Sequence, residues 1–328
     1  MIPVIKSILR SCLPPSAYAQ LATAYRAMTK AGDVMPTVPA PAVAAAPVAA
    51  PVVEAPVPEV SVSTLAAGVP LKPGDDFDLS APQMAASQEI TLEEKRRAAT
   101  EKFWHYPHDL GDGVVTKPWW DWLPYWHNVR RQAIFGQVHE IFGPSLKGLR
   151  CLDMACNSGF WSFEMIDRGA DSVYAFDVTE PMIEGALFVR NCRKDKPEYQ
   201  RIEFDVADYN AVNLPDDGFD LVLCLGMMYH LTDVYGVAQR VTRTTKRVAI
   251  IDSSVSDLSG DVLEIPPEGK YFWISKGEFS FVPTRDALRR IFRQAGFTKV
   301  TSWMPEEGHP CYKEYGPNGF RHIVVCEK

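Results

Sequence analysis

The stretch Leu149-Arg-Cys-Leu-Asp-Met-Ala-Cys-Asn-Ser-Gly159 decides the fold. Residues 149–154 form a short, mostly apolar run that predicts a buried strand, and a helical pattern over about 159–168 follows at once. The small residues between the two let the backbone approach a ligand closely, and the N-terminus of the helix supplies free N–H groups. A ligand site is therefore predicted where this strand ends.

Beyond this stretch, short β-rich runs alternate with helical patterns to the end of the chain. This alternation is typical of a wound sheet, so we expect an α/β, Rossmann-like fold with a seven-stranded, mostly parallel sheet and helices on both faces. The strands are expected at about 149–154, 172–177, 201–205, 219–225, 247–252, 298–303 and 321–326. The helices are expected at about 159–168, 181–193, 233–243 and 284–295.

The N-terminal part of the chain has three segments of different composition, ahead of a domain expected at 148–328. Residues 1–34 form a basic segment whose pattern predicts amphipathic helices that lie on an anionic membrane surface or dock on a partner, and its first 32 residues contain no acid. A cleaved signal peptide or a floppy basic terminus is the alternative. Residues 35–86 are a Pro/Ala/Val-rich linker, and residues 87–147 are an aromatic-rich, helical extension expected to act as a lid or cap.

Charge and cysteine usage exclude several classes of protein. Because 41 acidic residues outnumber 34 basic ones, no global field gathers nucleic acid. Seven cysteines without C-x-x-C spacing favour reduced thiols and a cytoplasmic setting, and no apolar run is long enough to predict a transmembrane helix. His105, His108 and Asp109 invite a metal hypothesis, but their aromatic neighbours favour a packed turn, so no metal is expected.

Two acidic residues stand at the ends of two adjacent expected strands. Asp153 precedes the first turn, where the glycine fingerprint G-x-G-x-x-G of a pyrophosphate site is absent and a carboxylate would repel phosphate. A carboxylate there suits a cationic ligand. Asp177 follows 24 positions later, close to the ~20-residue interval at which a carboxylate meets ribose hydroxyls. Together the two acids predict an adenosine that carries a positive tail.

This set of residues resembles the class I S-adenosylmethionine-dependent methyltransferases. The first motif of that family matches Asp153-x-Ala155-x-Asn157-x-Gly159, with Ala155 and Asn157 at two positions where glycine is usual, and the fourth-strand motif matches residues 219–231. The resemblance implies a class I methyltransferase fold and S-adenosyl-L-methionine as cofactor, with Asp177 at the ribose and Asp208 at the adenine. The implied cofactor-binding residues are Asp153, Ala155, Cys156, Asn157, Gly159, Phe160, Asp177, Val178, Asp208, Tyr209, Leu225 and Gly226.

Within that superfamily, residues 100–328 are similar to the group that contains transfer-RNA wobble-uridine carboxymethyl-transfer enzymes and their small-molecule relatives. The resemblance is carried by the motif G-M-M-Y-H at 226–230 and by the segments 266–273 and 281–297. The RNA enzymes follow the Tyr-His pair with arginines, whereas Leu231-Thr232-Asp233 stands here. This departure from the RNA enzymes predicts ordinary S-adenosylmethionine as the cofactor and disfavours a nucleic-acid partner. The aromatic lead-in at 104–116 resembles bacterial relatives from surface-glycan or secondary-metabolite pathways.

Methyl transfer needs an acceptor held in line with the methyl group and, for many acceptors, a base. His230 is the first candidate base because it follows the fourth strand, at the edge where ligands bind in such sheets, and Tyr229 would line the methyl path. Asp252 is the second candidate, although it could instead cap the next turn. Likewise, His230 could merely hydrogen-bond a loop or the cofactor. Trp120, Trp126 and Tyr271 are candidate acceptor-binding residues, with helix packing as the alternative for the tryptophans.

The leading hypothesis is a methyltransferase that acts at an oxygen of a small-molecule or glycan acceptor and that associates with a membrane or assembly through residues 1–32. A transfer-RNA modifying methyltransferase is the alternative enzyme. A non-catalytic cofactor-binding scaffold subunit is an alternative of another class. A nicotinamide-dependent oxidoreductase is disfavoured because the glycine fingerprint is missing.

Overall fold

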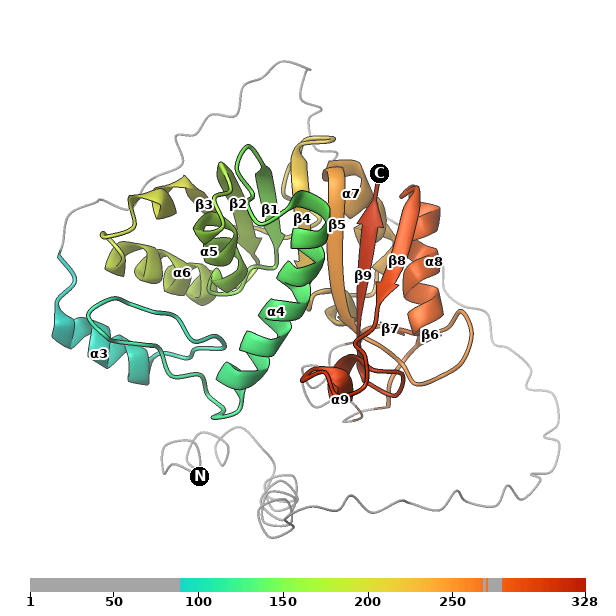
Figure 1. Ribbon diagram of the computed structural model, residues 1–328, viewed down its shortest axis with the longest axis horizontal. Coiled ribbons are helices and arrows are strands. Elements are labelled where there is room, and N and C mark those ends of the chain that lie inside the picture. Colours follow the sequence, from blue (N-terminus) through green and yellow to red (C-terminus); the bar gives the residue numbers. More distant parts are fainter. Residues whose placement is uncertain (1–88, 268–269, 271–278) are drawn as a thin grey trace, which may run out of the picture. The chain divides into compact units, whose positions relative to one another are not determined.

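The computed structural model describes residues 89–267, 270 and 279–328 (Figure 1). The basic segment at 1–34 and the linker at 35–86 lie outside the described residues. The main sheet has seven strands in the order β3-β2-β1-β4-β5-β9-β8. Their bounds are β1 Arg150–Met154, β2 Ser172–Asp177, β3 Ile202–Val206, β4 Phe219–Leu225, β5 Thr245–Ser254, β8 Lys299–Trp303 and β9 Arg321–Glu327.

Strands β1 to β5 pair in parallel, and β9 runs antiparallel to both of its neighbours. The strand order reverses between β1 and β4, which makes the carboxyl ends of these two strands a topological switch point. The seven expected strands and the four expected helices are all present, each within two residues of its expected ends. A small second sheet pairs β6, Leu263–Glu264, with β7, Val282–Pro283.

Helices cover both faces of the sheet because successive strand residues point to opposite sides. On β1, Cys151 packs into a first core and Leu152 packs into a second. The first core draws apolar side chains from α4 (Leu123–Phe142), α5 (Phe160–Asp167) and α6 (Glu180–Cys192). The second draws them from α7 (Val234–Thr244) and α8 (Arg285–Ala295), so these two groups of helices lie on opposite faces (Figure 1).

The aromatic extension packs into the first core. It begins with α3, Leu92–Glu101, which starts at Thr91 with a capping box completed by Glu94. An extended segment follows, in which alternate side chains are buried; they are Trp104, Tyr106, His108 and Leu110. Trp104, Tyr106 and Leu110 belong to the same core as Cys151, so the extension and the sheet share one hydrophobic interior.

Short helical turns complete the described chain. Pro197–Arg201 (η1) leads into β3, Met228–His230 (η2) follows β4, and α9, Tyr312–Tyr315, precedes β9. Among residues 89–267, 270 and 279–328, none of the helices combines the length and the apolar character that crossing a bilayer requires.

Candidate functional site

The turn between β1 and α5 has an unusual backbone. Ala155, Asn157 and Gly159 take left-handed conformations, with φ of 56°, 52° and 78°. Such conformations are strained for residues other than glycine, and they persist where surrounding contacts impose them. At Gly159 the packing adds a second constraint, since a Cβ atom would lie 2.7 Å from the ring of Phe204. We call residues 155–159 the cofactor loop, after the role that the sequence predicts for them.

Asp177 at the end of β2 holds this loop. Its Oδ2 accepts a hydrogen bond from the backbone N–H of Asn157 at 2.9 Å, and its Oδ1 accepts one from Thr179 at 2.9 Å. The carboxylate is buried, whereas Val178, the first residue after β2, is 67 % exposed. The structure therefore joins the two strand ends whose acids the sequence singled out, as expected for adjacent parallel strands.

Asp153 lies beneath the cofactor loop. Its carboxylate is buried, and Oδ2 accepts a hydrogen bond from the Ser162 hydroxyl of α5 at 2.6 Å. Burial raises the pKa of Asp153 to about 7, and the nearby Asp177 charge adds to that rise. Its role toward a cationic ligand stays a prediction, because its observed partner is Ser162.

The remaining predicted cofactor residues border the same edge of the sheet. Asp208 follows β3, is exposed, and accepts a hydrogen bond from the Asn210 N–H at 2.7 Å. Tyr209 packs against the second core, and Cys156 and Phe160 are buried. Burial raises the pKa of the Cys156 thiol well above its ordinary value, so this cysteine is present as the unreactive thiol.

Gly226 follows Leu225, the buried last residue of β4, and its backbone bonds to the neighbouring strand β5. Its N–H donates to the carbonyl oxygen of Asp252 at 2.7 Å, and its backbone is left-handed, with φ of 89°. A Cβ atom at this position would lie 3.3 Å from the Tyr229 hydroxyl. The glycine thus allows the chain to turn tightly above β5 and brings η2 back over the strand end.

Asp252 occupies the centre of a buried charged cluster. Oδ2 accepts hydrogen bonds from Arg130 Nε of α4 at 2.6 Å and from Arg321 Nη2 of β9 at 2.8 Å, and Oδ1 accepts one from the Tyr315 hydroxyl at 3.1 Å. Burial by itself would raise the pKa of Asp252, but the two guanidinium charges outweigh it and lower the pKa below its ordinary value. A carboxylate held in this way is a poor proton acceptor, so the base role of Asp252 stays a prediction that these contacts disfavour.

The two other predicted catalytic residues lie on η2, beside this cluster. The ring centroids of Tyr229 and His230 are 4.5 Å apart, and the Tyr229 hydroxyl lies 3.5 Å from Arg321 Nη1. Tyr229 is buried and His230 is half-buried. The structure therefore brings His230, Tyr229 and Asp252 to one edge of the sheet, above β4 and β5.

The predicted acceptor residues are only partly described. Trp126 of α4 lies beside the charged cluster, with its ring 5.2 Å from the Arg130 guanidinium and 5.6 Å from that of Arg321. Trp120 stacks on Trp119, with 3.8 Å between the ring centroids. Tyr271 lies outside the described residues. Trp126 thus lies next to the catalytic candidates.

Sequence reasoning missed the basic half of this cluster. Arg130 lies in α4 and Arg321 opens an apolar strand, and both are buried. A signal was present for Arg321, because a charge at the start of the run FRHIVVC falls in a strand that is otherwise apolar. Arg130 gave no such signal, since its partner is 122 positions away in the sequence.

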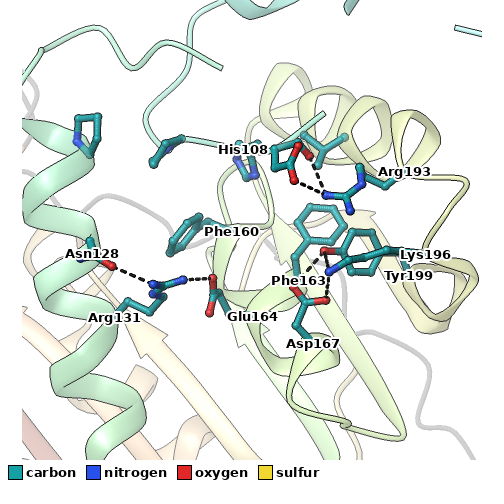
Figure 2. Close-up of a pocket in the computed structure, with 14 residues that line it drawn as sticks. His108, Asn128, Arg131, Phe160, Phe163, Glu164, Asp167, Arg193, Lys196 and Tyr199 are labelled. Atoms are coloured by element: carbon teal, nitrogen blue, oxygen red, sulfur yellow. Dashed lines mark hydrogen bonds and ion pairs between the residues drawn. The ribbon is translucent and has the colours of Figure 1, made fainter. Parts of the chain in front are cut away.

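A cavity of about 290 Å³ is lined by residues of α4 and α5, among them Asn128, Arg131, Phe160 and Glu164 (Figure 2). Aromatic side chains of Phe160, Phe163 and Tyr199 line it, and Phe160 is the predicted cofactor residue that it includes. Three ion pairs flank it, Arg131 with Glu164 at 2.9 Å, Arg193 with Asp109 at 2.8 Å and Lys196 with Asp167 at 2.6 Å. Because each of these three cations has an acidic partner, the cavity shows no preference for ligands of one charge.

The strand order, and the hydrogen bond that joins the loop after β1 to the acid at the end of β2, are those of a class I S-adenosylmethionine-dependent methyltransferase. The chain belongs to the family described as "Methyltransferase domain", whose model matches residues 125–302. Three features of the site suit a nucleoside cofactor. The loop after β1 has a left-handed backbone and is held by Asp177, and Val178 beside it is exposed. At the turn after β4, Gly226 leaves room that a Cβ atom would fill. Within the described residues, no group of three histidine, cysteine or acidic side chains could hold a metal ion.

Curated proteins that are similar to this chain are also transferases by name. The tRNA U34 carboxymethyltransferase of Trichodesmium erythraeum (strain IMS101) is 25% identical over 159 residues, which are 48% of this chain and 46% of that protein. The enzyme of the same name from Pseudomonas syringae pv. tomato is 29% identical over 156 residues, 47% of each chain. The chain thus spans about half the length of these curated relatives.

A solved structure shares the fold. The crystal structure of the N-terminal domain of EvdMO1 with SAH bound superposes with a TM-score of 0.52, at 16% identity, over 72% of this chain and 95% of that one. At this identity, the likeness shows the fold.

Proposed function

We propose that the protein transfers a methyl group from S-adenosylmethionine to an oxygen atom of a small-molecule or glycan acceptor. The observation that carries the proposal is the shared edge of the sheet: the cofactor loop held by Asp177 stands at β1, and the Tyr229–His230 pair stands beyond β4. Ligands of such sheets bind outside the carboxyl ends of strands at this switch point. The cofactor residues and the candidate base therefore face one ligand site.

The chain's own residues would act by positioning and by accepting a proton. Bound S-adenosylmethionine supplies a methyl group already activated by its sulfonium. In this reaction a C–O bond to the acceptor would form as the C–S bond breaks, and the electron pair would stay on sulfur. Asp177 and the cofactor loop would hold the nucleoside, and His230 would take the proton from the acceptor hydroxyl. Trp126 would pack against the acceptor, since it lies beside Arg130 and Arg321.

Titration calorimetry tests the cofactor half of this proposal. The purified protein should bind S-adenosylmethionine and S-adenosylhomocysteine with micromolar dissociation constants, and NADH should show no comparable binding. Binding would lead to a screen of hydroxyl-bearing acceptors with labelled S-adenosylmethionine. Absence of binding would reject the proposal and favour the scaffold alternative.

A second candidate function is modification of transfer RNA. It is favoured by the curated relatives, which are named tRNA U34 carboxymethyltransferase. It is opposed by the net charge of −7, which supplies no general attraction for a polyanion. Binding of transfer RNA measured against salt concentration decides between the two: an RNA enzyme should retain RNA at moderate salt, with affinity falling steeply as salt rises.

A further inference from the structure

His108 links the aromatic extension to the cofactor loop. Its Nε2 and the Ser158 hydroxyl oxygen lie 2.8 Å apart in a hydrogen bond, and the two residues are 4 % and 2 % exposed. Fifty positions separate them in the sequence. The bond is therefore a contact between two distant parts of the chain, made inside the protein at the loop that is predicted to hold the cofactor.

The extension fixes His108 in turn. The backbone N–H of His108 donates to the Thr116 hydroxyl oxygen at 2.7 Å, and its carbonyl oxygen accepts from the Thr116 N–H at 2.8 Å. The Thr116 hydroxyl donates to the Tyr106 carbonyl oxygen at 2.9 Å. The imidazole packs edge-on against Trp104, with ring centroids 5.5 Å apart. Burial lowers the pKa of His108 to about 3, so the ring is neutral and needs no counter-ion.

Two further packing contacts lie next to the loop. Tyr106 stacks on Phe160, the residue after the loop, with centroids 4.9 Å apart and ring planes 9° from parallel. On α6, Gly185 faces both Trp104 and Ser158, since a Cβ atom there would lie 3.4 Å from the first and 3.6 Å from the second. The segment that holds Trp104, Tyr106 and His108 thus packs beside the cofactor loop, with His108 in direct contact with it.

The loop needs such support because of its own sequence. Its left-handed positions at 155 and 157 hold Ala155 and Asn157, and such conformations persist in residues other than glycine only where neighbouring contacts impose them. Asp177 supports the loop from the sheet side through the Asn157 N–H, and the Asn157 side chain accepts from the Ser158 N–H at 2.8 Å. His108 is the partner of the Ser158 side chain from the extension side.

We propose that His108 is a positioning residue for the cofactor: through Ser158 it holds the cofactor loop in its binding conformation, so that cofactor affinity depends on the aromatic extension. The inference rests on the proposed function, because it assigns the cofactor to this loop. It adds to that function the assignment that residues 103–116 support cofactor binding, in addition to any contact they make with an acceptor.

Calorimetry with S-adenosylhomocysteine on the full-length protein tests this inference. His108→Ala should raise the dissociation constant about five- to tenfold, and Ser158→Ala should raise it by a similar factor, because each removes the same hydrogen bond. The double variant should bind no more weakly than the weaker single variant, since coupled effects are not additive. His108→Gln, whose amide can approach the position of Nε2, should recover part of the affinity.

The chain offers a matched control in His322. This histidine is also buried, and its Nε2 forms a hydrogen bond of the same 2.8 Å length with the Ser302 hydroxyl, between β9 and β8. His322→Ala should lower the melting temperature as His108→Ala does but change S-adenosylhomocysteine affinity less than twofold. Hydrogen exchange without ligand adds a second readout: the amides of Cys156 and Gly159 should exchange faster in His108→Ala and at the normal rate in His322→Ala.

The outcomes separate the two proposals. If the unmodified protein does not bind S-adenosylhomocysteine, the proposed function fails and the inference fails with it. If the unmodified protein binds and folded His108→Ala and Ser158→Ala bind equally well, the inference alone is overturned. Should His108→Ala not fold, Ser158→Ala decides the matter, because it deletes a single hydroxyl and leaves the packing of the imidazole in place.

Discussion

Arg130 of α4 and Asp252 of β5 form a buried ion pair across 122 positions of sequence, with Arg130 Nε donating to Asp252 Oδ2 at 2.6 Å. Arg321 of β9 shares the same carboxylate. The Asp252 carboxylate thus ties a helix from the first face of the sheet to two of its strands. The Gly226 N–H donates to the backbone carbonyl of the same residue, so the cluster also fixes the turn that leads to Tyr229 and His230.

Removing the Asp252 charge should destabilise the fold strongly. Asp252→Asn leaves two buried arginines without their anion, and breaking a buried pair in this way costs about 3–5 kcal/mol in the free energy of unfolding. Urea denaturation monitored by circular dichroism measures the change. Asp121→Asn is the control, because its exposed pair with Lys117 spans 3.9 Å and its loss should leave stability nearly unchanged. Equal stability of the two variants would show that the cluster does not hold the fold.

The same carboxylate predicts a pH dependence. Its pKa is lowered in the folded protein, so its stabilising contribution is fully present above the ordinary aspartate pKa of about 3.9 and is lost as the pH falls through the lower folded value. This contribution is therefore constant at neutral pH. The Asp252→Asn deficit in unfolding free energy should shrink only in strongly acidic solution.

Asp153 predicts the opposite sign in another pH window. Its pKa is about 7 in the folded protein, so between pH 4 and 7 the unfolded chain releases this proton and the folded protein keeps it. Stability therefore falls as the pH rises through this window. Asp153→Asn removes this titration. In denaturation curves at pH 4, 5.5 and 7, the free energy of unfolding of the variant should therefore rise relative to that of the unmodified protein at each increase in pH. A constant difference between the two would contradict the raised pKa.

The sequence allowed the fold to be predicted because its information is local. Each strand of the sheet is a short apolar run, and each helix has a periodic apolar pattern. Residues of β1 pack into two different cores, as expected for a sheet that is covered by helices on both faces. The linkage of the β1 and β2 turns was predictable for the same reason, since Asp177 follows Asp153 at the spacing of one βαβ unit.

The basic half of the site was not predictable, because it is assembled from distant segments. Arg130, Asp252 and Arg321 come from three elements, and no pattern in one of them indicates the other two. His108 shows the same limit. The sequence offered it as a metal ligand or as part of a packed turn, and its hydrogen bond with Ser158 appears only when the extension folds against α5 and α6.

Replacing the candidate base should affect turnover and not binding. His230→Ala should lower the turnover of an acceptor found in the screen by about 10²-fold, because general-base catalysis contributes roughly 10²–10⁴-fold. S-adenosylhomocysteine affinity should stay within about twofold, since the imidazole acts on the acceptor. His139→Ala, at an exposed position near the end of α4, is the matched control and should keep normal turnover. A His230→Ala protein with normal turnover would remove this residue as the base.

Replacing the predicted ribose ligand should affect binding first. Asp177→Ala removes the acceptor for the Asn157 and Thr179 N–H groups as well as the expected bonds to the ribose hydroxyls. The dissociation constant for S-adenosylhomocysteine should rise at least about tenfold. Asp216→Ala, which loses a surface pair with Arg243, controls for loss of an acidic side chain. Unchanged affinity in Asp177→Ala would move the nucleoside away from the end of β2.

Deleting residues 1–70 should separate the basic segment and most of the linker from the enzyme. The first core is complete within the described residues, so the shortened protein should keep its melting temperature and its S-adenosylhomocysteine affinity. Sedimentation with vesicles of anionic phospholipid tests the hypothesis that residues 1–32 dock on an anionic membrane surface. The full chain should sediment at low salt and the shortened chain should stay in solution, because the four basic residues of that segment supply the attraction. Loss of folding on deletion would refute the linker assignment, and equal sedimentation of both chains would refute the docking role.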